Sequence, residues 1–368
     1  MSTQPKFLVT SGVGKTGLPV ALQLLQKGMP VRVFVRRDDH RAAQLKRAGA
    51  EVFIGNQYDL SDLRKAMQGI QRAYQCAPTA PNGLHFNAAF TAAAFEAKLE
   101  HVVSLGQWLS SVDHPSLFTR EVYISDILIA MRDEMSVTTI NPGWFADNYI
   151  MGMGLAAHLG ILAMPLGDGD TKKNAAPSNE DITRVAVGAL LNPARYGGKT
   201  FRPTGPVLMS PNEIAAAMGE ALGRSVVYRD ISERMMLKAL KAMPPANYSE
   251  AAASQLAIYA EEYRRGTFAI NAPTDAVREL GGKDPEDFFS VARRAVVQRP
   301  DLLRSPLRTA AALGGFAKML LTRPPDVARI AADRDFVSIS APRFSQDDPS
   351  WNQSHTLPST SPNLRKVA

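Results

Sequence analysis

Residues 7–26 read FLVTSGVGKTGLPVALQLLQ, and this stretch decides the fold. A short apolar run, Phe7-Leu8-Val9, leads into a glycine-rich turn, and apolar residues at helical spacing follow the turn. A strand, a G-x-G-x-x-G turn and a helix in this order are typical of the first βαβ unit of a Rossmann-type dinucleotide-binding domain. In such a turn the first two glycines let the backbone approach a pyrophosphate, and the third lets the helix pack closely on the strand.

The turn itself supplies the expected phosphate site, because backbone N–H groups and the dipole at a helix N-terminus favour an anion. The ending Gly14-Lys15-Thr16 also resembles a P-loop of nucleotide triphosphatases. That motif needs a glycine five residues before Gly14, and Val9 occupies this position. We therefore expect Lys15 to be a loop cation near the cofactor phosphates. The expected phosphate site consists of Ser11, Gly12, Gly14, Lys15, Thr16 and Gly17.

The alternation of short β-branched runs with helical periodicity continues through the first half of the chain. This rhythm predicts an α/β fold with a doubly wound parallel sheet, in a domain over residues 1–150. The strands are predicted at residues 6–10, 31–36, 51–55, 72–76, 101–104 and 137–141. The helices are predicted at residues 17–27, 42–48, 60–67, 86–98 and 121–132.

A smaller α/β lobe is expected over residues 151–300. We expect it to cover the carboxyl edge of the sheet, and the pattern leaves open that some of its strands or helices join the sheet of the first domain. Short strands are predicted at residues 199–202 and 225–230. Three helix starts stand out by their capping residues. They are Ser178 with Asp181, Ser210-Pro211 with Glu213, and Asp284-Pro285 with Asp287.

Residues 301–368 form a third region. Residues 302–321 mix Leu, Phe and Met with cations, as an amphipathic helix does, although Pro306 and the pair Gly314-Gly315 weaken it. We expect this segment to dock on the protein's own lobes or on a partner chain rather than on a membrane. From about Ser340 the chain is rich in Ser, Pro, Asn and Asp, which predicts a disordered tail or a loosely docked strap.

The composition excludes several classes of protein. The chain has 368 residues, a net charge of +7 and one cysteine, Cys76, so no internal disulfide can form. Lys and Arg are mostly scattered singly, which argues against nucleic-acid binding. Neither a signal-peptide pattern nor a run of about 18 apolar residues occurs, so we expect a cytoplasmic protein. We predict no metal site.

The end of the second strand indicates which dinucleotide is bound. NAD-specific enzymes usually place an acidic residue there against the ribose 2′-hydroxyl, whereas this chain has Arg36 and Arg37. A planar guanidinium suits a 2′-phosphate, which favours NADP(H) over NAD(H). The alternative is that both arginines form surface ion pairs with Asp38 and Asp39.

Three further stretches carry a resemblance: residues 10–17 (TSGVGKTG), 49–60 (GAEVFIGNQYDL) and 141–148 (NPGWFADN). They are similar to the TGATGxxG, GAEVVxGDxxD and RPGxFxxN segments of the NmrA-like family of atypical short-chain dehydrogenases/reductases. Ser11 and Asn56 depart from that family's usual glycine and aspartate. The resemblance implies an NADP(H)-binding fold whose members are reductases or non-catalytic redox sensors. Residues after three strand ends are also expected to contact the cofactor: Asn56, Ala77, Pro78 and Pro142.

The wider superfamily exchanges a proton with its substrate through a Tyr-x-x-x-Lys pair, and this chain lacks it. No tyrosine has a lysine four residues later. Proton donors must then come from Ser104, His114 or Tyr123. Each has a purely structural alternative, because Ser104 ends a strand, His114 is typical of an exposed loop beside a proline, and Tyr123 lies on a helix where its ring can pack.

Aromatic and polar residues after the last two strands predict a pocket for a hydrophobic substrate, or else an interface between the lobes. They are Gln107, Trp108, Trp144, Phe145, Asn148 and Tyr149. We predict an NADPH-dependent oxidoreductase that transfers hydride to a small hydrophobic carbonyl, imine or conjugated double bond. The alternative is a non-catalytic NADP(H) sensor that acts through a protein partner, and a homodimer is left open.

Overall fold

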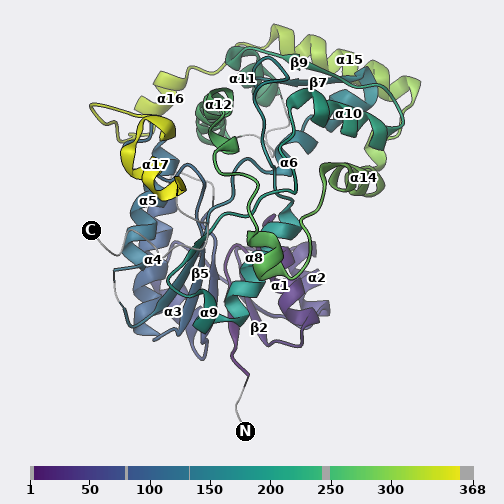
Figure 1. Cartoon of the computed structure of the whole chain (residues 1–368). Helices are drawn as coiled ribbons and strands as arrows, with labels where there is room; N and C mark the ends of the chain where they lie inside the picture. Colours follow the sequence, from purple (N-terminus) through teal and green to yellow (C-terminus); the bar gives the residue numbers. More distant parts are fainter. Residues whose placement is uncertain (1–3, 79–81, 132, 243–248, 357–368) are drawn as a thin grey trace.

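The structure is a computed structural model that describes the chain except residues 1–3, 79–81, 132, 243–248 and 357–368 (Figure 1). Seven parallel strands form one sheet in the order β3-β2-β1-β4-β5-β6-β8. The strand order changes direction between β1 and β4, which is the predicted doubly wound arrangement. The strands are β1 (Phe7–Val9), β2 (Val31–Val35), β3 (Glu51–Ile54), β4 (Arg72–Gln75), β5 (His101–Leu105), β6 (Ser136–Ile140) and β8 (Thr200–Phe201).

Alternate side chains of the central strands face two layers of helices. Phe7 and Val9 of β1 belong to one buried cluster, and Leu8 belongs to the other. Because both faces are covered, these strands read as nearly continuous apolar runs. The first layer contains α1 (Gly17–Gln26), α2 (His40–Arg47) and α8 (Asn179–Leu191), and the second contains α3 (Leu60–Met67), α4 (Gly83–Glu96) and α5 (Leu117–Ile129).

Two of the three predicted helix starts are confirmed. The hydroxyl of Ser178 accepts a hydrogen bond of 3.1 Å from the N–H of Asp181 at the start of α8. Ser210 and Glu213 form a reciprocal capping box at the start of α10 (Pro211–Leu222). These caps each satisfy backbone N–H groups that a helix leaves without intrahelical partners.

The third predicted start is wrong by three residues. Asp287, not Asp284, caps α14 (Phe288–Gln298), and its carboxylate accepts from the N–H of Ser290 at 2.8 Å. Asp284 instead forms an ion pair of 2.8 Å with Arg278 at the end of α13 (Ala276–Gly281). The sequence pattern alone does not distinguish an acidic cap from an acidic ion-pair partner nearby.

The second lobe is built on two parallel strands, β7 (Ile161–Met164) and β9 (Val227–Asp230). Its buried cluster is rich in aromatic side chains, among them Trp144, Tyr263 and Phe268. Within residues 151–300, α8, α9 (Pro193–Tyr196), β8 and α13 return to the large sheet or its helical layer. The remaining elements of the second lobe are α6 (Ala146–Ile150), α7 (Met153–Leu159), α11 (Glu233–Ala242), α12 (Glu250–Arg265), η2 (Thr267–Ala269) and η3 (Pro300–Leu302).

The C-terminal region wraps over both lobes (Figure 1). An uninterrupted helix, α15 (Pro306–Leu321), crosses the outer side of the second lobe, because Pro306 lies in its first turn and the two glycines are tolerated. It is followed by α16 (Val327–Asp333), η4 (Ser345–Asp347) and α17 (Pro349–Thr356). A docked strap is therefore correct for the chain up to Thr356, and later residues lie outside the described part. No helix among the described residues is long and apolar enough to cross a membrane.

Candidate dinucleotide site and adjoining cavity

The loop between β1 and α1 has no room for a side chain at its glycine positions. A Cβ atom on Gly12 would lie 1.8 Å from Cγ1 of Val33, and one on Gly17 would lie 2.3 Å from the carbonyl oxygen of Ser11. Ser11 has a φ of 49°, in the left-handed region that glycine adopts most easily. The N–H of Gly12 donates to the carbonyl of Phe34 at 3.2 Å, which holds the loop against the end of β2.

Lys15 and Thr16 lie where α1 begins. Thr16 is the N-cap residue, but its side chain makes no capping hydrogen bond and instead contacts the sulfur of Cys76 at 3.6 Å. The ammonium of Lys15 forms an ion pair of 3.2 Å with Asp147 on α6, so this loop cation also touches the second lobe. An uncapped helix N-terminus beside a lysine favours the binding of an anion such as a phosphate.

Two exposed arginines follow β2, namely Arg36 and Arg37. Asp38 pairs with Lys46 at 2.7 Å, and Asp39 pairs with Arg41 at 2.6 Å. The alternative in which the two arginines are the partners of these acids is therefore wrong. Both residues directly follow the end of β2, where the 2′ position of an adenosine ribose is expected.

Arg41 is a further cation of this site that the sequence pattern did not reveal. It lies in the first turn of α2, which begins two residues earlier than predicted because Asp39 caps it. Its Nη1 donates to the carbonyl of Val13 in the glycine loop at 3.4 Å. The hydrogen bonds from Arg41 and from the helix N-terminus lower the pKa of Asp39 to about 2.

Asn56 lies in the turn after β3. Its side-chain oxygen accepts from the N–H of Tyr58 at 3.1 Å, and its own N–H donates to Asp62 at 2.9 Å. These local hydrogen bonds give Asn56 a structural role in stabilising the turn. Its predicted contact with the cofactor stays a prediction.

A cavity of about 530 Å³ opens between the two lobes beside the glycine loop. Its walls combine residues after the strand ends with Leu256, Tyr259 and Phe268 of the second lobe, which the sequence did not indicate. The predicted site residues that line it are Lys15, Ala77, Pro78, Gln107, Trp108, Pro142, Trp144, Phe145 and Asn148.

Tyr149 is a predicted substrate residue that does not line the cavity. Its ring is fully buried, and its hydroxyl donates to that of Tyr263 at 3.0 Å and accepts from Asn174 at 3.2 Å. Burial raises the pKa of Tyr149 to about 12. It therefore belongs to the core of the second lobe. For Tyr149 this agrees with the alternative interpretation, in which the aromatic residues pack within the protein rather than line a pocket.

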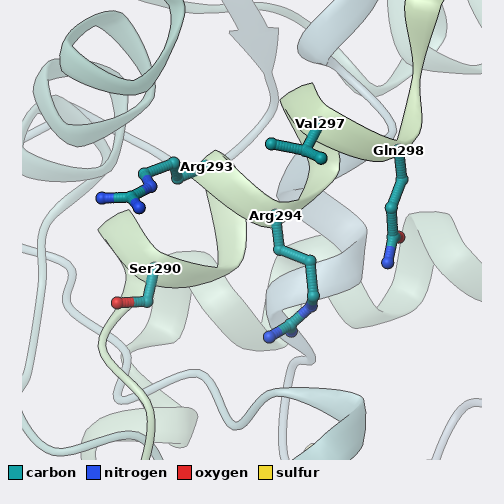
Figure 2. Close-up of a pocket in the computed structure, with 5 residues that line it drawn as sticks. All are labelled: Ser290, Arg293, Arg294, Val297 and Gln298. Carbon is teal, nitrogen blue, oxygen red and sulfur yellow. The ribbon is translucent and has the colours of Figure 1, made fainter.

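A second hollow, of about 470 Å³, runs along α14 (Figure 2). All five residues that line it come from this one helix, and Figure 2 shows Arg293 and Arg294 pointing in different directions. Arg294 is held by ion pairs with Glu180 and Glu286. With no second element to converge on it, this surface groove lacks the concave arrangement of a ligand site.

Two buried polar atoms at the cavity have no hydrogen-bond partner among the described residues. They are Nε1 of Trp144 and Oδ1 of Asn141. Trp144 lines the cavity, and Asn141 lies behind Gly106, where an added Cβ would meet its oxygen at 2.3 Å. Buried groups of this kind are rare without a partner, so a ligand that accepts from the indole and donates to the amide oxygen would complete them.

Gln107 is fixed rather than mobile in the cavity wall. Its Nε2 donates to the hydroxyl of Tyr259 at 3.2 Å, and its Oε1 accepts from the hydroxyl of Thr119 at 2.8 Å. These bonds join a loop of the sheet domain to α5 and α12. The side chain thus connects the two lobes across the cavity.

Glu121 is the cavity residue with the most unusual acidity. It lies on α5, lines the cavity, and is half-buried. Burial raises the pKa of Glu121 to about 7, against the opposing effect of the Arg120 charge. A carboxyl group that keeps its proton near neutral pH can donate that proton to a bound molecule. In the sequence this residue resembles any exposed helical glutamate.

The three predicted proton donors do not line the cavity. Ser104 is buried in β5, and Tyr123 is half-buried on α5. The expectation that His114 is exposed is wrong, because it is fully buried with its Nε2 2.9 Å from Oε1 of Glu262. Their catalytic roles stay predictions, and Glu121 has the geometry that they lack.

Comparisons with known proteins agree with this geometry. The sequence profile of the NmrA-like family matches residues 3–278. The chain belongs to the NmrA-like family. A relative of the NmrA-like chain, the NAD(P)H azoreductase of Xenophilus azovorans, is 27% identical over 78% of this chain and 96% of its own length.

Solved structures of related fold extend the comparison. The NADPH-dependent quinone oxidoreductase QOR2 of Escherichia coli in complex with NADPH superimposes with a TM-score of 0.67, at 20% identity, over 78% of this chain and 99% of its own. NmrA, a negative transcriptional regulator in complex with NAD, superimposes with a TM-score of 0.64, at 16% identity, over 79% of this chain and 95% of its own. These likenesses show that the NmrA-like chain has their fold.

The strap of η4 and α17 lies beyond the segment that matches the family, yet it supports the cavity wall. Trp351 is 2% exposed, and its Nε1 donates to the carbonyl of Trp108 at 2.8 Å. The ring of His355 stacks on Trp351 at 3.8 Å and approaches Trp108 at 5.3 Å. The strap is thereby tied to the loop that carries Trp108.

The strap is also tied to Glu262 of α12, which accepts a hydrogen bond from the N–H of Ser345. Burial raises the pKa of Glu262, but the hydrogen bonds from His114, Ser345 and Thr267 outweigh this effect and leave its pKa below the usual value.

Proposed function

We propose that this chain is an NADPH-dependent oxidoreductase that reduces a small hydrophobic carbonyl, imine or conjugated double bond. One observation carries the proposal. A single cavity runs from Lys15 of the glycine loop to the aromatic residues Trp108 and Trp144, so a dinucleotide and an apolar acceptor can meet in it. The azoreductase and the quinone oxidoreductase described above are named for acceptors of this conjugated kind.

The residues present fit a dinucleotide. The tight glycine turn and the uncapped start of α1 suit a pyrophosphate, Arg36 follows the strand end where a 2′-phosphate is expected, and the amide oxygen of Asn141 has no donor among the described residues. When bound, NADPH supplies the hydride. The chain's own contribution is to position the two reactants and to shield them from water.

The walls of the cavity favour a flat apolar acceptor with a hydrogen-bond acceptor atom. Trp108, Phe145 and Phe268 supply aromatic surface, and the indole N–H of Trp144, which is buried without a partner among the described residues, is our candidate donor to an oxygen or nitrogen of the acceptor once the side chain turns toward it. A hydride acceptor also needs a proton. Glu121 is the cavity acid that retains one near neutral pH, so it is our candidate donor.

The test is NADPH oxidation measured against quinones, imines, enones and aldehydes, with azo dyes added because of the azoreductase. Turnover of at least one apolar conjugated acceptor, with saturation kinetics, is the expected result. Tight NADPH binding without turnover of any compound would instead favour the non-catalytic sensor. In that case the search turns to a protein partner whose binding depends on the cofactor's redox state.

A further inference from the structure

Helix α15 leaves most of its apolar side chains uncovered. It packs on α7 and α11 with Met319 buried, while its other large side chains face outward. The exposed fractions are 81% for Leu307, 55% for Leu313, 38% for Phe316, 46% for Leu320 and 86% for Leu321. Monomeric soluble proteins seldom gather apolar residues on one exposed face unless something binds it.

Four of these five exposed residues share one side of the helix. At about 100° per residue, Leu320, Leu313, Leu321 and Leu307 fall within an arc of about 140°, and Lys318 lies just beyond it. A Cβ atom on Gly314, which falls within this arc, would have no atom within 4 Å, in agreement with the exposure of the four leucines. We call it the α15 face. Figure 1 shows α15 at the outer edge of the second lobe, away from the large sheet.

The charge around the α15 face has one sign. Residues 302–325 contain four cations and no Asp or Glu, and the cations are Arg304, Arg308, Lys318 and Arg323. All four are exposed, but Arg308 falls outside the arc, about 100° past Leu307, and donates to the carbonyl oxygens of Pro300 and Leu303. A second copy that docked through the same face about a twofold axis would bring two sets of these cations together, which is unfavourable. An anionic lipid surface matches both features, since acyl chains accept the apolar arc and headgroups accept the cations.

We propose that the α15 face is a docking surface for an anionic lipid membrane, on which α15 lies parallel to the surface. The sequence had favoured docking on the protein's own lobes or on a partner chain over a membrane, and in the structure the docking on the protein itself involves the side of α15 that carries Met319. The α15 face lies beyond residues 3–278, the part that matches the family. The proposal is independent of hydride transfer.

The experiment is co-sedimentation of the full chain with vesicles of phosphatidylglycerol and phosphatidylcholine in equal parts, compared with phosphatidylcholine alone. We expect binding to the anionic vesicles, weakened by salt. The double variant L313E/L321E should bind at least roughly tenfold more weakly, and Lys318→Ala about fivefold more weakly. The matched control is Val207→Glu, at a residue 55% exposed on a different surface, and it should bind as the parent does.

Several outcomes would overturn the proposal. They are equal binding to both vesicle types, an equal loss in Val207→Glu, and a dimer in light scattering that L313E/L321E dissolves, which would assign the α15 face to a second copy. Thermal melting checks that each variant is folded. The vesicle binding of Lys318→Ala tests the proposal even if the double variant does not fold.

Discussion

Replacing Glu121 by Gln removes a proton donor from the cavity while keeping the size of the side chain. Burial raises the pKa of Glu121 to about 7, so about half of these groups are protonated at that pH. Each further pH unit lowers the protonated fraction about tenfold. If Glu121 is the donor, kcat/KM for the best acceptor should be flat in mild acid and fall with this slope above about pH 7.

The variant Glu121→Gln should lose roughly a hundredfold in kcat, which corresponds to about 2.7 kcal/mol of transition-state stabilisation. The descending limb of its pH profile should disappear, and its Kd for NADPH should stay unchanged. Initial rates of NADPH oxidation and calorimetric titration give these values. The control is Glu220→Gln, an exposed carboxylate on α10. An unchanged slope in Glu121→Gln would refute the assignment.

The same pKa has a consequence for stability. The folded chain holds the proton of Glu121 more tightly than the unfolded chain, so this residue's contribution to the free energy of unfolding falls as pH rises from about 4.5 to about 7. Between about pH 5 and about pH 8, melting temperatures should therefore decrease less in Glu121→Gln than in the parent. An identical decrease in both would indicate an ordinary pKa and remove the basis for the proposed acid.

Four other substitutions test the rest of the site. Arg36→Ala should weaken NADPH binding in titration calorimetry about tenfold or more, through the loss of about 1.5–3 kcal/mol, and should leave NADH binding unchanged. The control variant Arg47→Ala should bind both cofactors as the parent does. Equal losses for NADPH and NADH in Arg36→Ala would contradict the assignment. In Gly17→Ala the new Cβ would lie 2.3 Å from a carbonyl oxygen of the loop, so both dinucleotide affinity and the melting temperature should fall. Trp144→Phe keeps a ring but removes the indole N–H, and KM for the acceptor should rise roughly fivefold with NADPH affinity constant. Trp351→Ala removes a buried ring and should cost about 3–5 kcal/mol of unfolding free energy in urea titrations.

Much of the fold follows from local sequence. The predicted strands agree with the structure within two residues, because apolar runs such as 31–35 are buried on both faces and bounded by turns. Helix starts were less accurate. The helix α5 begins four residues before its predicted start, since Ser116 caps it without the acidic third residue that makes a cap recognisable in the sequence.

The candidate site also has one part that the sequence indicates and another part that it does not. The glycine loop is contiguous in sequence, so its motif was sufficient to indicate it. The far wall of the cavity comes from Tyr259 and Phe268, more than a hundred residues after the loops they face, on segments without a motif. His114 is buried against Glu262 of the second lobe, and Glu121 is half-buried in the cavity wall; both are tertiary effects that neither spacing nor composition contains.

The strap shows why composition was insufficient near the C-terminus. A segment rich in Ser, Pro and Asn offers little apolar surface to offset the entropy of ordering, and the prediction weighed that average. In the structure, the contacts that offset this entropy are concentrated at a few residues. Trp351 and His355 pack beside Trp108, and the N–H of Ser345 donates to the buried carboxylate of Glu262. These anchors depend on a surface to which both lobes contribute, through Trp108 and Glu262. The order of the strap is thus a property of the assembled fold, and through Trp108 it acts on the wall of the cavity.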